Sequence, residues 1–562
     1  MGRTPDPAGI AVRVLNSMKH SGFWFAGVVT LAVSGMRGQE FDLIVAGGRV
    51  VDGQGNPWYR ADIGIANGRI VKLGSLDGRR AKRVIQVHDQ VVSPGFIDMM
   101  GTTSVPLLVN RASAESKLRQ GITTLLAGEG GSVAPRSVRA RDSDETADGY
   151  QWRAFGEYFR LLEKKGIPMN VIHNVGAAQV RRVVIGDEDR APTAQQLEQM
   201  KELVGEAMRD GVVGLSTALI YPPGTYAKTD ELVAMAKVVG QYGGSYMSHM
   251  RNESNQLLEA IRETIHIGEA AGIPSHVFHL KAAGEENWPL MKEAIALIQS
   301  ARDRGLDVTA DVYPYIRNGI GLTSFIHPRH YAAGSAPFLK TLGDPSVRAD
   351  LRKEIENTSD WENWYRHVGK NWDNVLVVGV GPGLDKQYEG RSVAEIAKMR
   401  GIDNWTTFFD LVQRGPVTVN PKSMNEDQKM LALRTPWVSV CTDAPPTDAS
   451  KATYSHPRAF GSFVRVLAKY VREERVISLE AAVRQMSSLP ANFLRLYERG
   501  RIAPGMAADL LVFDPDKVQD TATFTQPLSF PEGMPYVIVN GRVEIDNGRF
   551  TEENGGAVLR LR

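Results

Sequence analysis

Two histidines end apolar, strand-like segments at places where their side chains could share a metal ion. His249 lies in residues 245–253, after a predicted strand and before a predicted helix, and His279 occupies the equivalent place in residues 274–281. Imidazoles at the ends of neighbouring parallel strands would converge at one mouth of a barrel, which suits a Zn²⁺ site with a position open for water. Each histidine alone could instead be a hydrogen-bonded structural residue. His276 should point to the opposite face of a regular strand from His279.

Asp443 follows another apolar run, residues 437–440. An aspartate at the end of a late barrel strand can bind metal and accept a proton from water. The alternative is a helix cap or an Asx turn before residues 444–446. Cys441 is the only cysteine, so the chain has no intrachain disulfide and no cysteine-cluster zinc site. Any metal must therefore be held mainly by His, Asp or Glu.

The middle of the chain alternates between strand-like and helical patterns. Short β-branched runs at 123–127, 169–173 and 306–312 lie between helical stretches such as 195–208 and 257–271. Such alternation predicts parallel strands joined by crossover helices. At this length the expected α/β architecture is a (β/α)8 TIM-like barrel, with its chemistry at the carboxyl ends of the strands.

The sequence patterns at both ends of the chain predict β-strands that flank the barrel. Residues 41–94 and 505–562 contain alternating apolar runs, with Asn-Gly pairs at 67–68 and 540–541 that favour hairpin turns. We therefore expect a small β-sandwich domain built from both chain ends, and a metal-dependent barrel over 95–504.

The alternation weakens between residues 316 and 433. Trp361, Trp364 and Trp372 and many polar residues lie in this region. We expect an inserted subdomain or lid over 316–433, because long insertions near a barrel mouth often shape specificity.

Charge and the first residues bear on partners and location. The chain has 66 basic and 64 acidic residues, a net charge of +2, which gives no electrostatic reason to expect a nucleic-acid partner. Arg13 and Lys19 precede an apolar run at 23–33 and then small residues, the layout of a signal peptide over 1–38. A buried helix or an uncleaved anchor is the alternative. The signal predicts a periplasmic or secreted protein without stable membrane insertion after its removal.

Six ordered segments resemble one branch of a known superfamily. They are residues 214–226, 248–253, 279–284, 311–315, 456–458 and 501–509. All resemble the D-aminoacylase, or N-acyl-D-amino-acid deacylase, branch of the metal-dependent amidohydrolase superfamily. The resemblance implies a barrel with a small β-sandwich and a mechanism in which metal-bound hydroxide attacks the amide carbon.

The resemblance also implies roles for individual residues. His249 and His279 match the two histidines that hold the tightly bound zinc. Asp443 matches the catalytic aspartate that takes a proton from water and returns it to the leaving amine. Arg458 resembles an arginine that binds the substrate carboxylate, a role suited to its planar fork. A surface salt bridge is the alternative for Arg458.

Three further side chains resemble substrate contacts. Lys281 and Tyr313 or Tyr315 occupy positions that contact substrate in the family. For the two tyrosines, packing without substrate contact is an equal alternative.

The sequence departs from the family at two metal positions. After Asp98 the superfamily carries His-x-His, but Met100 and Thr102 stand here. Thioether and hydroxyl groups bind Zn²⁺ poorly, so we expect one ion per chain. The family pattern Gly-Asn-Cys-Gly becomes Gly-Glu-Gly-Gly at 128–131. Glu129 could supply a carboxylate to the metal in place of the thiolate; its alternative is a salt bridge to a neighbouring loop.

Together these features predict zinc-dependent hydrolysis of N-acyl-D-amino acids, which releases a carboxylate and a free D-amino acid. The expected partner is a small N-acylated amino acid or dipeptide. One alternative is an amidohydrolase for D-amino-acid-containing dipeptides or cyclic amides. Another is a non-catalytic binding protein on a decayed scaffold, against which the joint presence of His249, His279 and Asp443 argues.

Overall fold

An eight-stranded parallel sheet forms the centre of the protein. The computed structural model describes residues 40–137, 149–332 and 334–561, so the signal peptide expected over 1–38 lies outside the described residues. The strands follow the order β16-β12-β11-β10-β9-β8-β7-β6. Their bounds are β6 (Phe96–Asp98), β7 (Ile122–Ala127), β8 (Asn170–Gly176), β9 (Gly214–Ala218), β10 (Ser245–His249), β11 (Ser275–Val277), β12 (Val308–Val312) and β16 (Val438–Val440).

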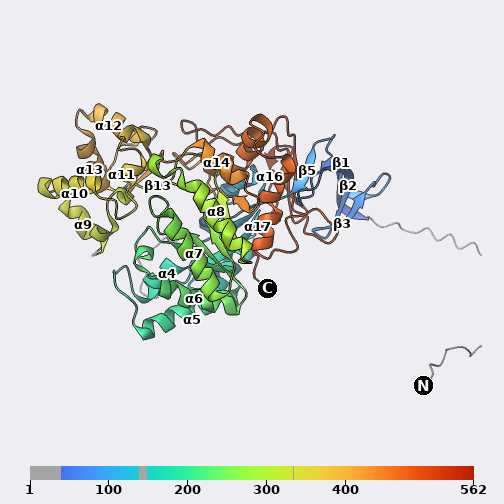
Figure 1. The fold of residues 1–562 in the computed structure, drawn as a ribbon. Coiled ribbons are helices and arrows are strands. Elements are labelled where there is room, and N and C mark those ends of the chain that lie inside the picture. The colour runs from blue at the N-terminus through green and yellow to red at the C-terminus, as the bar shows by residue number, and fades with distance from the viewer. Residues whose placement is uncertain (1–39, 138–148, 333, 562) are drawn as a thin grey trace, which may run out of the picture. The chain divides into compact units, whose positions relative to one another are not determined.

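Helices cover the outside of this sheet. Every residue of β7 to β10 is buried, as expected for parallel strands covered on both faces. The covering helices are α4 (Ala177–Val184), α5 (Ala194–Asp210), α6 (Thr229–Gln241), α7 (Leu257–Ala271), α8 (Leu290–Asp303) and α16 (Leu479–Met486). Helices α4 to α8 form the green part of the ribbon in Figure 1. The expected α/β barrel is confirmed.

Buried side chains join the two ends of the barrel sheet, β6 and β16. The Asp98 carboxylate accepts hydrogen bonds from the Thr442 backbone N–H at 2.9 Å and from the Thr442 hydroxyl at 2.6 Å. The Lys117 ammonium lies 3.1 Å from the same carboxylate and donates to the Ala444 carbonyl at 2.7 Å. Asp98 and Lys117 are fully buried. We refer to Asp98, Lys117 and Thr442 as the barrel seam.

A nine-stranded sheet combines strands from the first and last parts of the described chain. Strands β5 and β17 pair antiparallel, with Ser93 opposite Leu511. Asn-Gly turns with positive φ connect β2 to β3 and β18 to β19, as the sequence predicted. The strands are β1 (Phe41–Val50), β2 (Tyr59–Ala66), β3 (Arg69–Gly74), β4 (Ala81–Gln86), β5 (Val91–Pro94), β17 (Leu510–Phe513), β18 (Tyr536–Val539), β19 (Arg542–Asp546) and β20 (Arg549–Phe550).

A segment between β12 and β16 has a hydrophobic core of its own. Trp361, Trp364 and Trp372 are all buried in this core. Helix α14 (Glu426–Leu433), inside the expected range 316–433, packs instead against α8, β12 and β16 of the barrel. The segment, largely yellow in Figure 1, contains β13 (Ile320–Gly321), α9 (Ser335–Thr341), α10 (Pro345–Asn357), α11 (Trp364–His367), β14 (Val375–Val380), α12 (Val393–Arg400), α13 (Asn404–Arg414) and β15 (Val417–Pro421).

The last described residues run beside the start of β8. The Val171 N–H donates to the Ala557 carbonyl at 3.0 Å, and the Leu559 N–H donates to the Val171 carbonyl at 2.8 Å. The Leu561 N–H donates to the Gly211 carbonyl at 3.0 Å. Leu559 and Leu561 also pack against the apolar barrel interior. Among the described residues, no helix is long and apolar enough to cross a membrane.

Candidate active site

A cavity at the carboxyl ends of the barrel strands collects most of the predicted site residues. It is lined by Glu129, Tyr221, His249, Glu253, His279, Lys281, Tyr313, Asn318, Gly319, Ile320, Trp364 and Asp443. Side chains from the ends of several different strands meet there, as the barrel architecture requires. Six of the eight predicted residues therefore line one cavity; Arg458 contacts Asp443.

The three predicted metal ligands face one another. His249 ends β10, while His279 and Glu129 each lie two residues beyond a strand. Glu129 Oε1 is 2.8 Å from His249 Nδ1 and 3.4 Å from His279 Nε2. Ligand atoms around a tetrahedral Zn²⁺ ion lie about 3.3 Å apart, given metal–ligand distances of about 2.0–2.1 Å. A carboxylate and two imidazoles at this spacing fit a catalytic zinc site, although their role as ligands stays a prediction.

Charge holds this trio together. Burial raises the pKa of Glu129, but hydrogen bonds to His249 and His279 outweigh burial and lower that pKa to about 2. Burial and Lys281 lower the pKa of His279. The nearby carboxylates outweigh both effects and raise the pKa of His279 to about 9. In the metal-free protein at neutral pH, Glu129 is therefore expected to be anionic and His279 to be protonated.

The Glu129 loop turns tightly against β9. Gly130 has φ +67°, and a Cβ atom there would lie 2.5 Å from the Ala218 backbone nitrogen. The Gly130 N–H also donates to the Ser216 hydroxyl at 3.1 Å. No side chain fits at the position where the resemblance expects a cysteine, and Glu129 supplies the anionic group on the cavity side.

Asp443 and Arg458 form a close ion pair. Arg458 starts α15 (Arg458–Arg465), and its guanidinium lies 2.5 Å from the Asp443 carboxylate. Asp443 and His279 both adopt positive φ angles, 49° and 37°, in the strained left-handed region. Burial raises the pKa of Asp443 above its ordinary value, although Arg458 acts against that rise. The predicted proton acceptor and the predicted carboxylate clamp are thus in direct contact.

The remaining predicted substrate contacts differ in position. Lys281 is buried, and its ammonium lies 2.5 Å from Glu253. Tyr313 lines the cavity, and its buried hydroxyl has no hydrogen-bond partner among the described residues. Tyr315 lies outside the cavity lining and donates its hydroxyl to the Pro457 carbonyl at 3.4 Å.

His276 contacts none of the three predicted ligands directly; its ring packs against Phe278 and Phe493 of the apolar barrel interior. Its ring contacts Asp311 at 2.9 Å and Thr309 at 2.7 Å. Asp311 in turn accepts a hydrogen bond from the His279 N–H at 2.6 Å. His276 therefore helps to fix the backbone that carries His279.

Sequence reasoning missed two buried carboxylates beside the trio. Glu253 Oε1 lies 2.9 Å from His279 Nδ1, and Glu362 accepts a hydrogen bond from the Glu253 N–H at 2.7 Å. Burial, together with Glu253, raises the pKa of Glu362 to about 8. Glu253 had a signal, because it stands four residues after His249 in a family motif. Glu362 had none, because it lies in the inserted segment.

The residues where the superfamily carries its second set of metal ligands make other contacts in this chain. Met100 is buried in the apolar barrel interior, and Asp98 belongs to the barrel seam. Within the described part of the chain, the groups that could hold a metal are Glu129 with His249 and His279, and His249 with Glu253 and Glu362. Neither group includes residues 98–102.

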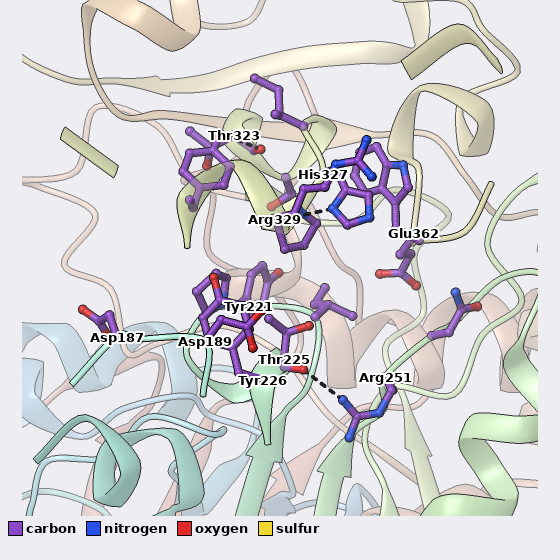
Figure 2. A pocket seen from close by; sticks show the side chains of 18 of the residues that line it. Asp187, Asp189, Tyr221, Thr225, Tyr226, Arg251, Thr323, His327, Arg329 and Glu362 are labelled. Atoms are coloured by element: carbon purple, nitrogen blue, oxygen red, sulfur yellow. Dashed lines mark hydrogen bonds between the residues drawn. The ribbon is translucent and has the colours of Figure 1, made fainter. Parts of the chain in front are cut away.

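A larger pocket of about 730 Å³ adjoins the cavity and shares Tyr221 and Trp364 with it. Figure 2 shows its side chains, with Tyr221 and Thr225 from the barrel loops facing Thr323 and His327 from the inserted segment. A pocket of this size can hold a substantial part of a small organic substrate.

Known proteins share this architecture and sequence. The model of the amidohydrolase family matches residues 83–544. N-acyl-D-glutamate deacylase of Alcaligenes xylosoxydans xylosoxydans is 33% identical over 507 residues, 90% of this chain and 93% of that protein. The crystal structure of N-acyl-D-glutamate deacylase from Bordetella bronchiseptica, complexed with zinc and a phosphonate inhibitor, has a TM-score of 0.79 at 30% identity. It covers 93% of this chain and 100% of the solved chain.

A structure of D-aminoacylase is similar at the same level, with a TM-score of 0.77 and 30% identity over 92% of this chain and 100% of the solved chain. The family match and these similarities over more than nine-tenths of the chain agree with the α/β barrel fold. The chain therefore belongs to the amidohydrolase family and, within it, to the D-aminoacylase branch of hydrolases that act on linear amide C–N bonds.

Proposed function

We propose that the protein hydrolyses the amide bond of N-acyl-D-amino acids in a zinc-dependent reaction that releases a carboxylate and a D-amino acid. The observation that carries this proposal is the placement of Glu129, His249 and His279 in one cavity with Asp443, which is paired to Arg458. The relatives named N-acyl-D-glutamate deacylase and D-aminoacylase support the substrate class.

The side chains divide the work as follows. Arg458 and Lys281 bind the free carboxylate of the amino acid, and the Tyr313 hydroxyl contributes a hydrogen bond beside them. A divalent ion held by the trio would supply positive charge that acidifies water and polarises a carbonyl. Asp443 accepts the proton from water and delivers it to the departing nitrogen.

Binding and proton transfer are linked through one ion pair. In the structure Arg458 holds Asp443 at 2.5 Å. A substrate carboxylate that binds Arg458 competes with this contact and leaves Asp443 free to accept a proton. Substrates that lack the carboxylate should leave the pair closed, which favours linear N-acyl amino acids over cyclic amides.

A single ion per chain is part of the proposal. Met100 and Thr102 offer no imidazole at the second position, and Asp98 is engaged in the barrel seam. A solved D-aminoacylase is described as showing one-metal activation and second-metal attenuation, which agrees with activity from one ion.

The adjoining pocket favours a second candidate substrate class, D-amino-acid-containing dipeptides. Its volume of about 730 Å³ leaves room for an acyl group much larger than acetyl. We also propose export of the protein, based on the signal-like pattern of residues 1–38.

The decisive experiment measures amine release from a panel of N-acetylated D- and L-amino acids and matched dipeptides. Metal-free protein is compared with protein that has received one equivalent of Zn²⁺. We expect zinc-dependent release from D-substrates that carry a free carboxylate. Metal binding without hydrolysis of any substrate would favour a binding protein on a decayed scaffold.

A further inference from the structure

A single buried carboxylate lies behind both predicted zinc-binding histidines. Glu253 is 1% exposed. Its Oε1 atom lies 2.9 Å from His279 Nδ1, and its Oε2 atom lies 3.7 Å from His249 Nε2. These are the outer nitrogens, because His249 Nδ1 and His279 Nε2 face Glu129.

Metal binding would fix what these outer nitrogens must do. An imidazole that gives one nitrogen to a metal normally carries its proton on the other and donates it to a partner. His249 Nε2 is buried and has no hydrogen-bond partner within the described part of the chain. Glu253 is the carboxylate nearest to both outer nitrogens, and a small rotation would shorten the 3.7 Å separation to a hydrogen bond.

Neighbouring groups hold Glu253 in this place. The Lys281 ammonium lies 2.5 Å from its Oε1 atom, and the Ala283 N–H donates to its backbone carbonyl at 2.7 Å. Glu362 accepts a hydrogen bond from the Glu253 N–H at 2.7 Å. Glu362 belongs to the inserted segment, so that segment contacts the residue that orients both imidazoles.

We propose that Glu253 is a shared positioning residue, which accepts the outer N–H groups of both His249 and His279, and that Glu362 fixes it from the inserted segment. The role of Glu253 rests on the metal site of the proposed function. Through Glu253, the inserted segment influences how tightly the metal is held as well as which substrate fits.

A second cation is the competing interpretation of the same atoms. His249, Glu253 and Glu362 offer ligand atoms that all lie within 4.8 Å of one another. Such a site would require His249 to give both nitrogens to cations at once. It would also place a cation on Glu253, whose charge Lys281 already balances at 2.5 Å. A positioning role avoids that cost. It requires the Lys281 ammonium, which lies 2.7 Å from His279 Nδ1, to donate to Glu253 when that nitrogen carries its proton.

The test is the zinc affinity of Glu253→Gln, measured by chelator competition, with metal content counted by elemental analysis. We expect affinity to fall roughly 10- to 100-fold, the usual effect of removing such a partner. The visible spectrum of the Co²⁺-substituted protein should also change, because ligand orientation differs. Glu362→Ala should weaken zinc binding by a smaller factor, and Glu362→Gln, which keeps an acceptor oxygen, should restore it.

The matched control is Glu263→Gln. Glu263 is a nearby carboxylate that pairs with Arg251 at 2.9 Å and contacts neither imidazole. The zinc affinity and the cobalt spectrum of the Glu263→Gln variant should equal those of the wild type. Melting temperatures of the metal-free variants identify any general folding defect. If Glu253→Gln does not fold, the zinc affinities of the Glu362 variants test the positioning role instead.

Two results would overturn the positioning role. One is wild-type zinc affinity and an unchanged cobalt spectrum in Glu253→Gln. The other is two ions per wild-type chain, with the second lost in both Glu253→Gln and Glu362→Gln. Because zinc affinity is measured apart from turnover, a wild-type protein that binds zinc but releases no amine would contradict the proposed function alone.

Discussion

Asp443 and Arg458 illustrate how two site residues restrain each other before substrate arrives. Burial raises the pKa of Asp443, and the ion pair with Arg458 acts against that rise. When a substrate carboxylate takes over Arg458, the freed Asp443 becomes a stronger base. Substrate binding itself would then prepare proton transfer.

Asp443→Asn should keep its metal and lose turnover. An amide cannot accept the proton, so we expect kcat to fall by about 10²–10⁴-fold. Amine release and metal content are measured on the same preparation, with the exposed Asp516→Asn variant as control. Turnover close to wild type in Asp443→Asn would remove Asp443 from the mechanism.

Zinc binding should release a proton near neutral pH. The pKa of His279 in the metal-free protein is raised to about 9, so His279 is protonated at pH 7 and must lose its proton to bind metal. Apparent zinc affinity should therefore rise about tenfold per pH unit as pH increases from 7 towards 9. Titration calorimetry in buffers of different ionisation enthalpy measures how many protons zinc binding releases. A zinc affinity that does not change with pH would contradict the assignment of a protonated His279 in the metal-free protein.

At the scale of elements, strand ends made much of the site predictable. His249, His279 and Asp443 each follow an apolar run, and parallel strands bring such positions to one edge of a sheet. The fold class and the helix at Leu257–Ala271 followed from the same periodicity. Glu362 could not be predicted, because its contact with Glu253 depends on how the inserted segment docks. Tyr315 also shows that neighbouring motif positions can face different surroundings.

The barrel seam should be essential for stability. Lys117→Met leaves the buried Asp98 carboxylate without its cation, which costs about 3–5 kcal/mol of unfolding free energy. Urea denaturation of metal-free protein measures this change. Lys164→Met, at an exposed position of α3 (Phe155–Lys165), should change stability by less than about 0.5 kcal/mol. A seam variant as stable as the control would show that β6 and β16 are held by other contacts.

At the scale of the whole molecule, distant parts of the chain complete the barrel at its two ends. The inserted segment lines the pocket near the carboxyl ends of the strands, while the last described residues pair with the start of β8. The sequence predicted that both chain ends share one β-domain. It held no signal for the pairing of residues 557–561 with the barrel, because this contact spans nearly four hundred residues.

Removal of residues 557–562 should destabilise the protein while sparing the chemistry of molecules that stay folded. The truncation breaks three backbone hydrogen bonds and deletes Val558, Leu559 and Leu561, which uncovers the apolar surface they pack against, at a combined cost of about 3 kcal/mol or more. Thermal unfolding and activity per folded molecule are compared with Arg560→Ala, which removes the ion pair to Glu163 and the cation–π contact with Phe159 but keeps the backbone pairing of the tail. An unchanged melting temperature would show that the tail adds little.

The close approach of Gly130 to β9 also has an evolutionary consequence. Because a Cβ atom there would lie 2.5 Å from the Ala218 nitrogen, a cysteine at that position would require the Glu129 loop or the end of β9 to move. A single substitution at position 130 therefore cannot replace Glu129 by a thiolate without further changes around β9. We therefore expect Glu129 and Gly130 to be retained or replaced together in related sequences.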